Sequence, residues 1–372
     1  MMNQTEFNSN EAKAVAEIIK IAEEIIREKS VVTVDNQRGP VTRDQHPKSH
    51  GCVGAELIVE DVPEDLRIGI FKEPRTYPAW IRFSNSSETI QDDAKPDVRG
   101  MAMKVLGVDG EKILEGQQHE RTQDFILINS ERFFLRDIQD SLEFAETVAA
   151  LRHVPQIPLL GKLLSLVIFI LKFGIFHPTS VMIAISASRK TVSNPLLIQY
   201  WSTTAYRLGP HAIKFSLRPR VDHLPDSKTN NIRSKNFLRE VMADYLNKQD
   251  AFFDFLVQIQ TDPRTMPVED ATVRWEAPYR RIGTVKIPKQ QFDTEKRRIF
   301  DEGLSFNPWH SLAEHAPLGK VNLLRRSVYV STSNLRRQLN AQPCQEPTEE
   351  EYYKIFGSMP PIGLPGLTLD SK

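Results

Sequence analysis

The sequence predicts an α+β fold, in which helices surround a curved antiparallel β-sheet or β-barrel. Two observations lead to this prediction. Four short β-rich runs lie between residues 31 and 135, separated by turns rich in Pro, Gly and Asp, which is typical of antiparallel sheets and barrels. Segments with helical character stand on either side of that region, over 10–29 and 320–340.

The N-terminal segment, residues 1–30, is predicted to contain an amphipathic helix that docks on the main body. Ser9 or Asn10 can cap this helix, and apolar residues then recur at the spacing of one helix face. These apolar residues are Val15, Ile18, Ile19, Ala22, Ile25 and Ile26.

The strand predictions rest on apolar runs that end at turn residues. A polar loop over 220–236 is followed by a predicted helix over 237–260. The predicted strands are CVGAELIVE (52–60), AWIRFSN (79–85), GMAMKVLGV (100–108), DFILINS (124–130) and HAIKFSLRP (211–219), with one more ending in 284–292.

The domain organisation follows from the absence of any convincing linker or internal repeat. Residues 31–340 are predicted to form one domain, and residues 341–372, rich in Pro and Glu, a surface tail. The most apolar stretch, 157–176, has a charge-free centre at 163–171. A spanning helix needs about 20 apolar residues. Because the charge-free centre is shorter than that, three interpretations stay open. The stretch is a buried or substrate-lining helix, a helix that contacts one membrane leaflet, or a membrane-spanning helix.

Composition excludes several classes of protein. The 48 Lys and Arg residues balance the 48 Asp and Glu residues, so no global charge recruits nucleic acid. The two cysteines, Cys52 and Cys344, exclude a four-cysteine zinc site and a disulfide scaffold. The polar N-terminus lacks an apolar signal core, which predicts a cytoplasmic location, with membrane association if 157–176 contacts lipid. No oligomeric state follows from the sequence.

The first candidate for chemistry is His46, which stands shortly before a glycine-punctuated strand. Glycines allow a flat ligand to approach the backbone closely, and Arg43 lies three residues before His46, within reach of an anionic group on that ligand. His46 and His50 can also be read as metal ligands four residues apart, but Pro47 opposes a regular helix between them.

The second candidate is Arg82-Phe-Ser84, followed by Asp97-Val-Arg99-Gly100. An arginine on a strand with apolar neighbours needs a buried or interfacial anion. For Arg99, the alternative is a structural ion pair with Asp97 or Asp124.

The third candidate is Asn129, at the end of an apolar strand and before Phe133 and Phe134. An asparagine at that place often caps a strand or forms a turn. The functional alternative is a neutral hydrogen-bond donor inside an apolar pocket.

The fourth candidate is Tyr329. If 320–340 is helical, Arg325 and Arg336 share one face with this phenol. Two cations beside one phenol favour the phenolate, and tyrosine is an axial ligand of haem iron in proteins. The alternative is a solvated Arg-rich helix with a packed tyrosine.

Taken together and in this order, the four segments resemble the haem catalases and the smaller catalase-related haem proteins, among them the allene oxide synthases. The resemblance covers residues 40–137 and 300–340. It rests on Arg43-x-x-His46 with Gly51 and Gly54, Arg82-Phe-Ser84 with Asp97-x-Arg99-Gly100, Asn129 with Phe133-Phe134, and Arg325-x-x-x-Tyr329 with Arg336.

The resemblance implies an antiparallel β-barrel of the haem catalase type with surrounding helices and a buried haem b, whose iron Tyr329 ligates. His46 would be the catalytic acid and base, with Asn129 as its hydrogen-bonding companion. The other residues would bind or support the haem site: Arg43 and Arg82 at the propionates, Ser84 at the histidine, Phe134 in the pocket, and Arg325 and Arg336 at the tyrosinate or a haem carboxylate.

The resemblance further implies a haem-dependent peroxidase or catalase-like oxidoreductase. Catalases carry an apolar residue directly before the distal histidine, whereas Gln45 stands there in this chain. Gln45 therefore leaves room for organic peroxides, and the apolar stretch 157–176 offers a route from a membrane to the pocket. We expect a fatty acid hydroperoxide that is reduced or rearranged. The alternatives are a minimal catalase that decomposes hydrogen peroxide, a haem-binding sensor without turnover, and a structural protein without haem.

Overall fold

The computed structural model describes residues 6–35, 40–155, 160–220 and 234–357. Parts of four predicted segments therefore lie outside the described residues: the start of the N-terminal segment (1–5), the start of the apolar stretch (157–159), most of the polar loop (221–233) and the end of the C-terminal tail (358–372). Residues 36–39 of the predicted domain 31–340 lie outside them as well.

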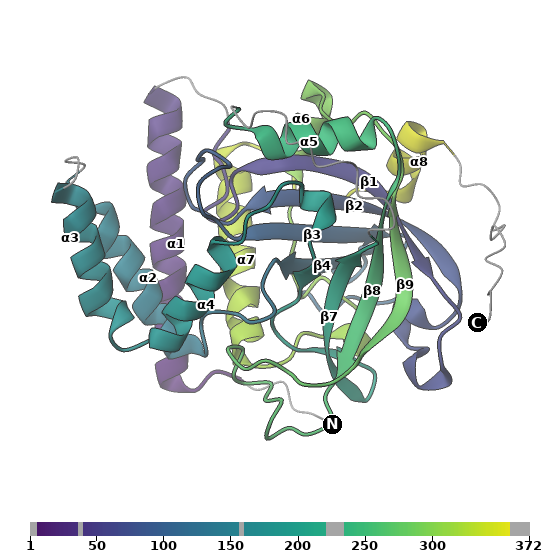
Figure 1. Cartoon of the computed structure of the whole chain (residues 1–372), viewed down its shortest axis with the longest axis horizontal. Coiled ribbons are helices and arrows are strands. Elements are labelled where there is room, and N and C mark those ends of the chain that lie inside the picture. The colour runs from purple at the N-terminus through teal and green to yellow at the C-terminus, as the bar shows by residue number, and fades with distance from the viewer. Residues whose placement is uncertain (1–5, 36–39, 156–159, 221–233, 358–372) are drawn as a thin grey trace.

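A closed antiparallel β-barrel forms the centre of the molecule (Figure 1). The strands follow the order β5-β4-β3-β2-β1-β9-β8-β7, and pairing of β5 with β7 closes the ring, while β6 pairs with β7 alone. The predicted antiparallel barrel is confirmed. The strands are β1 (Ser49–Val59), β2 (Arg75–Asn85), β3 (Arg99–Leu106), β4 (Thr122–Ile128), β5 (Tyr200–Trp201), β6 (Tyr206–Leu208), β7 (His211–Pro219), β8 (Ala251–Ile259) and β9 (Tyr279–Ile287).

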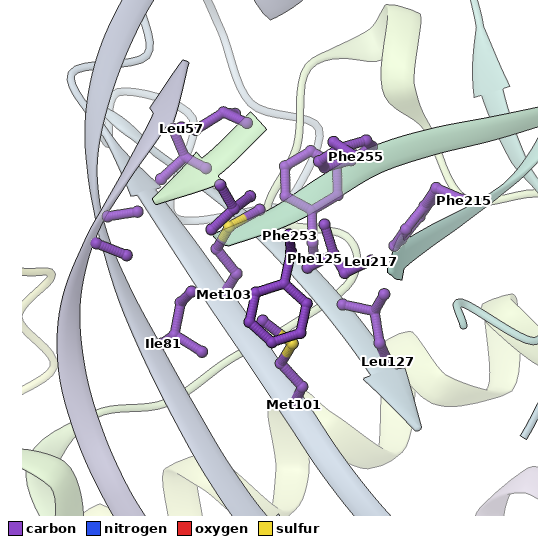
Figure 2. Close-up of a cluster of buried hydrophobic side chains, with 14 of the residues drawn as sticks. Leu57, Ile81, Met101, Met103, Phe125, Leu127, Phe215, Leu217, Phe253 and Phe255 are labelled. Atoms are coloured by element: carbon purple, nitrogen blue, oxygen red, sulfur yellow. The ribbon is translucent and has the colours of Figure 1, made fainter. Parts of the chain in front are cut away.

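The barrel interior is filled by apolar side chains. Because successive residues of a strand point to opposite faces, Ile81 and Phe83 of β2 and Met101 and Met103 of β3 point inward, into the cluster that Figure 2 shows. The alternate residues of the same strands, such as Arg82, point outward. A filled interior leaves no room for a large ligand, so a functional site has to lie on the outer face of the barrel.

Helices cover the outside of the barrel. The predicted N-terminal helix is confirmed as α1 (Ser9–Asp35), which packs against α2 (Ile138–Arg152) and α7 (Lys320–Leu339). The remaining helices are α3 (Leu160–Phe169), α4 (Pro178–Ser188), α5 (Phe237–Leu246), α6 (Glu295–Gly303) and α8 (Glu349–Phe356), the π-helix η3 (Ile170–Gly174), and the 3₁₀ turns η1 (Glu64–Leu66), η2 (Gly69–Phe71), η4 (Pro195–Leu197) and η5 (Ala313–His315).

One predicted segment differs from the structure. The helix predicted over 237–260 ends at Leu246, and strand β8 follows, because its alternate apolar residues fill the barrel. Within the predicted C-terminal surface tail, residues 349–356 form α8, which a capping box at Thr348 begins. Tyr352 of α8 is only 3% exposed and its ring lies 5.3 Å from that of Trp80. Packing on an aromatic surface therefore overrides the polar composition of the tail.

The apolar stretch forms α3 and η3, and α4 follows. Leu163 and Leu166 are 57% and 55% exposed, so the prediction of a buried helix is wrong for α3. Among the described residues, no helix has both the length and the apolar character needed to cross a membrane.

Candidate active site

His46 lies in the segment just before β1, and its backbone holds an unusual conformation. Its φ of 58° is left-handed, a region that few non-glycine residues adopt, although His is among those enriched there. Its N–H donates to the Ser86 carbonyl at 3.3 Å, and Nδ1 of its ring lies 2.9 Å from Oγ of Ser84. Such strain persists where the surrounding structure holds it, and it is frequent at functional sites.

A flat surface on the outer face of the barrel receives the imidazole of His46. Ser84 of β2 pairs with Gly100 of β3. A Cβ on Gly100 would lie 2.6 Å from Cε1 and 2.7 Å from Nδ1 of His46. The imidazole of His46 can therefore approach β3 this closely only because residue 100 is a glycine. The hydroxyl of Ser84 holds the ring in place.

His46 is neutral at physiological pH. Burial lowers its pKa to about 3, and the nearby charges of Arg82, Arg43 and Arg325 act in the same direction. With Nδ1 bound to Ser84, the Nε2 atom has no protein partner among the described residues. A neutral imidazole with one free nitrogen can accept a proton there.

Arg82 extends from β2 on the same face as Ser84. Its Nε donates to Oδ1 of Asp301 at 2.8 Å, and both side chains are buried. Its Nη2 is buried too but has no hydrogen-bond partner in the part of the chain that the structure describes. Because buried donors are nearly always satisfied, this orphan donor indicates a missing acceptor.

Two further arginines converge on the segment that ends α6. Arg43 and Arg336 both donate to the carbonyl of Leu304, at 2.6 and 3.1 Å, and Arg43 also pairs with Glu302. Burial lowers the pKa of both guanidiniums, and so do neighbouring cations, Arg82 acting on Arg43 and Arg43 acting on Arg336. Together with the Arg82–Asp301 pair, three cations meet two carboxylates, and an additional anion would balance this arginine cluster.

Tyr329 lies on α7 next to Arg325. Nη2 of Arg325 lies 3.5 Å from the phenol oxygen of Tyr329, and Nη1 reaches Tyr206 at 3.3 Å and Thr204 at 3.1 Å. Burial opposes the charge of Arg325, but the two phenols outweigh it and raise its pKa. The predicted pair of Arg325 and Tyr329 is thus formed, whereas Arg336, seven residues beyond Tyr329, belongs to the arginine cluster.

The outer face of the barrel is open beside His46. Ala102, Ile126 and Ile128 share the outward face of β3 and β4 and stay half-buried, although nearly all of their strand neighbours are buried. Tyr329 and Arg325 are half-buried as well. The site thus combines apolar side chains, donors for anions and a phenol oxygen, which suits a flat amphipathic ligand.

Asn129 and Phe134 take positions that the sequence did not specify. The side chain of Asn129 accepts from the Arg99 N–H at 3.0 Å and donates to the Ala187 carbonyl at 3.2 Å. These contacts fasten the end of β4 to the start of β3 and to the end of α4. Phe134 packs between Phe133 and Phe144, with ring centroids 5.2 and 5.0 Å away.

A pocket of about 390 Å³ opens beside Asn129. Asn129 pairs through its backbone with Arg99, the neighbour of Gly100, so the pocket begins close to the surface that holds His46. Its other lining residues are Lys190, Thr191, Val192, Ile198, Gln199 and Trp201.

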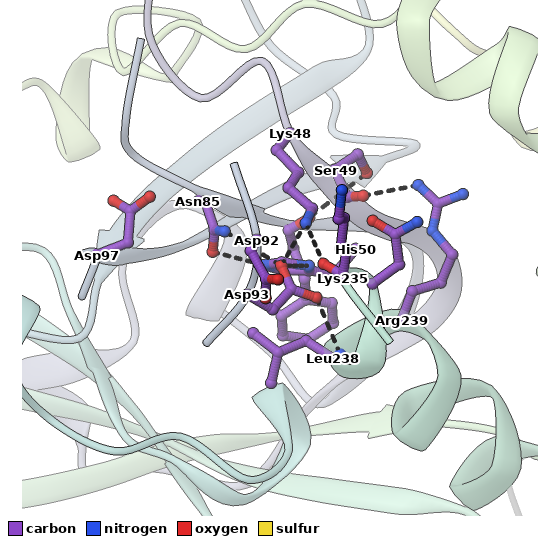
Figure 3. Close-up of polar contacts among 12 residues, drawn as sticks. Lys48, Ser49, His50, Asn85, Asp92, Asp93, Asp97, Lys235, Leu238 and Arg239 are labelled. Atoms are coloured by element: carbon purple, nitrogen blue, oxygen red, sulfur yellow. Dashed lines mark hydrogen bonds and ion pairs between the residues drawn. The ribbon is translucent and has the colours of Figure 1, made fainter. Parts of the chain in front are cut away.

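A buried polar network behind His46 escaped the sequence analysis. Figure 3 shows Asp93 of the segment after β2 among Lys48, His50 and Asn85. Lys48 pairs with Asp93 at 2.7 Å, and Nε2 of His50 bonds Oδ1 of Asn85 at 2.7 Å. Arg99 donates to Asn85 and to the Asp93 carbonyl.

This network corrects two alternatives. The partners of Arg99 are structural, as one alternative held: its guanidinium donates to Asn85 and to the Asp93 carbonyl, and the charges of Asp97 and Asp93 act on it. Asp124 instead pairs with Lys104. Among the described residues, no group of three or more His, Cys, Asp or Glu side chains can hold a metal ion. The network instead anchors the start of β1, and with it the segment that carries His46.

The molecule resembles catalases of known structure. A fungal catalase and catalase A from Saccharomyces cerevisiae each align with 82% of this chain, with a TM-score of 0.62 and 17% sequence identity. The alignments cover 61% and 63% of those chains, so this chain spans less than two thirds of their length. No family model and no curated protein matches the sequence. The similarity establishes a catalase-type fold.

Proposed function

We propose that this chain is a haem enzyme of the catalase type that reacts with peroxides, preferably with organic hydroperoxides such as those of fatty acids. The observation that carries the proposal is the position of His46, held by Ser84 over Gly100 and facing the open outer face of the barrel. Membership of the smaller, allene oxide synthase-like branch of the family remains a prediction.

The residues of the site fit a haem. The orphan donor of Arg82 and the excess charge of the arginine cluster suit the propionates, with Arg43 and Arg336 beside Arg82. Half-buried Ala102, Ile126 and Ile128 suit the porphyrin face. Tyr329, with Arg325 at its phenol oxygen, would ligate the iron. When bound, haem b supplies the redox chemistry that cleaves an O–O bond.

His46 would move the proton. Nε2 of the neutral imidazole accepts the proton of the peroxide O–H and returns it to the departing oxygen, as a general base and then a general acid. Ser84 at Nδ1 keeps the ring in place during both transfers. Because the pKa of His46 lies near 3, the ring is a strong acid once protonated and releases the proton readily. Asn129 as the companion of His46 remains a prediction.

The pocket beside Asn129 favours an organic substrate. Its volume of about 390 Å³ is far larger than a hydrogen peroxide molecule requires, and Val192, Ile198 and Trp201 line it. The other four lining residues, Asn129, Lys190, Thr191 and Gln199, are polar, so the pocket suits an amphipathic ligand. A fatty acid hydroperoxide could place its chain in this pocket and its peroxide group toward His46.

An absorption spectrum of the purified protein tests the cofactor and its ligand. We expect a haem Soret band in the wild type and a changed spectrum, or loss of haem, in Tyr329→Phe, because phenylalanine has no oxygen for the iron. Tyr206→Phe is the matched control, since that phenol also contacts Arg325. An unaltered Tyr329→Phe spectrum would remove Tyr329 from the iron, and a wild type without a Soret band would overturn the haem proposal.

The substrate is tested on the haem-loaded protein with two peroxides. We expect consumption of a fatty acid hydroperoxide and little oxygen release from hydrogen peroxide. If the enzyme leaves fatty acid hydroperoxides untouched and rapidly evolves oxygen from hydrogen peroxide, the preference for organic peroxides is wrong and the chain is a minimal catalase.

A further inference from the structure

We propose that α3, η3 and α4 form a membrane-docking arm that inserts into one leaflet of an anionic phospholipid bilayer. The arm is defined as residues 160–188. This inference goes beyond the proposed function and does not depend on it, since no residue of the arm belongs to the residues assigned to haem.

Exposed apolar side chains concentrate on the arm. Of the fifteen large apolar side chains that are exposed among the described residues, ten lie between positions 163 and 185. Isolated exposed apolar residues are normal, but a contiguous group marks an interaction surface. The ten are Leu163, Leu164, Leu166, Val167, Ile170, Leu171, Ile175, Phe176, Met182 and Ile185.

The arm projects from the molecule yet is firmly attached to it. α3 packs against α2 and continues into η3, and Figure 1 shows α3 at the outer edge, away from the barrel. Phe173 and Ile183 are 1% and 3% exposed and anchor the arm, and the Phe173 ring lies 5.5 Å from the ring of Phe144 in α2. The exposed residues are therefore presented by an ordered surface.

The shape of α3 favours lipid over a protein groove. Its exposed residues between 163 and 167 occupy an arc of roughly 160° at 100° per residue, whereas a helix bound in a groove buries a narrower stripe of anchors. The ten residues of α3 rise about 15 Å, half of a hydrocarbon core of about 30 Å. The arm can thus enter one leaflet without crossing it.

The charge around the arm matches anionic headgroups. Residues 147–221 contain no Asp or Glu, although the whole chain carries equal numbers of acidic and basic residues. Lys172 and Arg189 are exposed at the end of η3 and directly after α4. The nearest acidic residues on the N-terminal side are Glu143 and Glu146 of α2, which line a surface pocket together with Lys172. Oε2 of Glu143 lies 2.7 Å from Nε2 of His177. Basic residues beside inserted apolar ones are typical of interfacial helices.

Vesicle flotation of the purified full-length protein tests the proposal without any need for haem. We expect the wild type to float with vesicles of phosphatidylcholine and phosphatidylglycerol. The triple variant Leu166→Ser/Leu171→Ser/Phe176→Ser should bind at least about tenfold more weakly, because each change removes a large apolar side chain from the bilayer.

The matched control changes three equally exposed apolar residues on other parts of the surface. Ile90, Ile299 and Ile355 are 65%, 66% and 50% exposed, and Ile90→Ser/Ile299→Ser/Ile355→Ser should bind vesicles as the wild type does. Lys172→Glu/Arg189→Glu should weaken binding to the anionic vesicles and leave the weak binding to pure phosphatidylcholine unchanged.

Three results would overturn the proposal. The first is a wild type that stays unbound with both kinds of vesicle, which would exclude lipid as the occupant. The second is an apolar triple variant that binds as tightly as the wild type. The third is a dimer in sedimentation, without vesicle binding, that the same triple variant dissociates, which would assign the arm to a second copy of the chain.

Discussion

Gly100 offers the sharpest test of the geometry around His46. A Cβ at this position would lie 2.6 Å from Cε1 of His46 and 2.9 Å from Oγ of Ser84. Ordinary contacts begin near 3.4 Å, so Gly100→Ala would have to push the imidazole away by about 0.8 Å. A displacement of that size in the direction away from Ser84 stretches the 2.9 Å contact beyond hydrogen-bonding distance.

The magnitude follows from two effects. Overpacking costs about 1–3 kcal/mol, and the lost hydrogen bond costs about 1 kcal/mol. We therefore expect Gly100→Ala to lower the free energy of unfolding by about 2–4 kcal/mol, measured by urea titration. In the haem-loaded enzyme, a displacement approaching 1 Å should lower kcat/KM for the peroxide about a hundredfold.

Gly303→Ala is the matched control. A Cβ at Gly303, in the last turn of α6, would meet no atom within 4 Å, so this variant should be as stable as the wild type or slightly more stable. If Gly100→Ala unfolded at the same urea concentration as the wild type and kept its kcat/KM, the reasoning about the His46 surface would be refuted.

Three further predictions concern buried charges. Arg82→Leu leaves Asp301 without its partner in a buried site and should destabilise the protein by about 3–5 kcal/mol in urea unfolding; a wild-type midpoint would show that Asp301 is not buried as described. Lys104→Met leaves the buried carboxylates of Asp124 and Glu346, each 2.6 Å from the lost ammonium, without their partner. We expect a comparable loss of unfolding free energy, and an unchanged urea midpoint would contradict this expectation. The free energy of unfolding should also fall as the pH drops from about 6.5 toward 4. The reason is that burial lowers the pKa of four histidine side chains, which therefore bind protons more readily in the unfolded chain. Equal urea midpoints at pH 7 and pH 5 would contradict this expectation. The four, with pKa values of about 3 or 4, are His46, His50, His310 and His315.

Local patterns predicted the barrel and its covering helices. Strands β1 to β4 and β7, and helices α1 and α7, lie where apolar alternation or helical spacing placed them. Such signals are local, since two-residue and 3.6-residue periods are properties of one segment. The same reliance on local signals misassigned 237–260, where an apolar run rich in Phe is equally compatible with a helix and with strand β8.

The sequence by itself proposed His46, Ser84, Arg325 and Tyr329 as candidates for one haem site, through a resemblance carried by motifs a few residues long. The structure shows the contacts of His46 with Ser84 and of Arg325 with Tyr329. Only the tertiary structure decided that Arg43 and Arg336 both donate to the carbonyl of Leu304, directly after α6. It also decided that Gly100 lies against the His46 ring. Those contacts join residues far apart in the chain, and a contact of that kind depends on how strands and helices pack. No period or spacing within a segment encodes that packing.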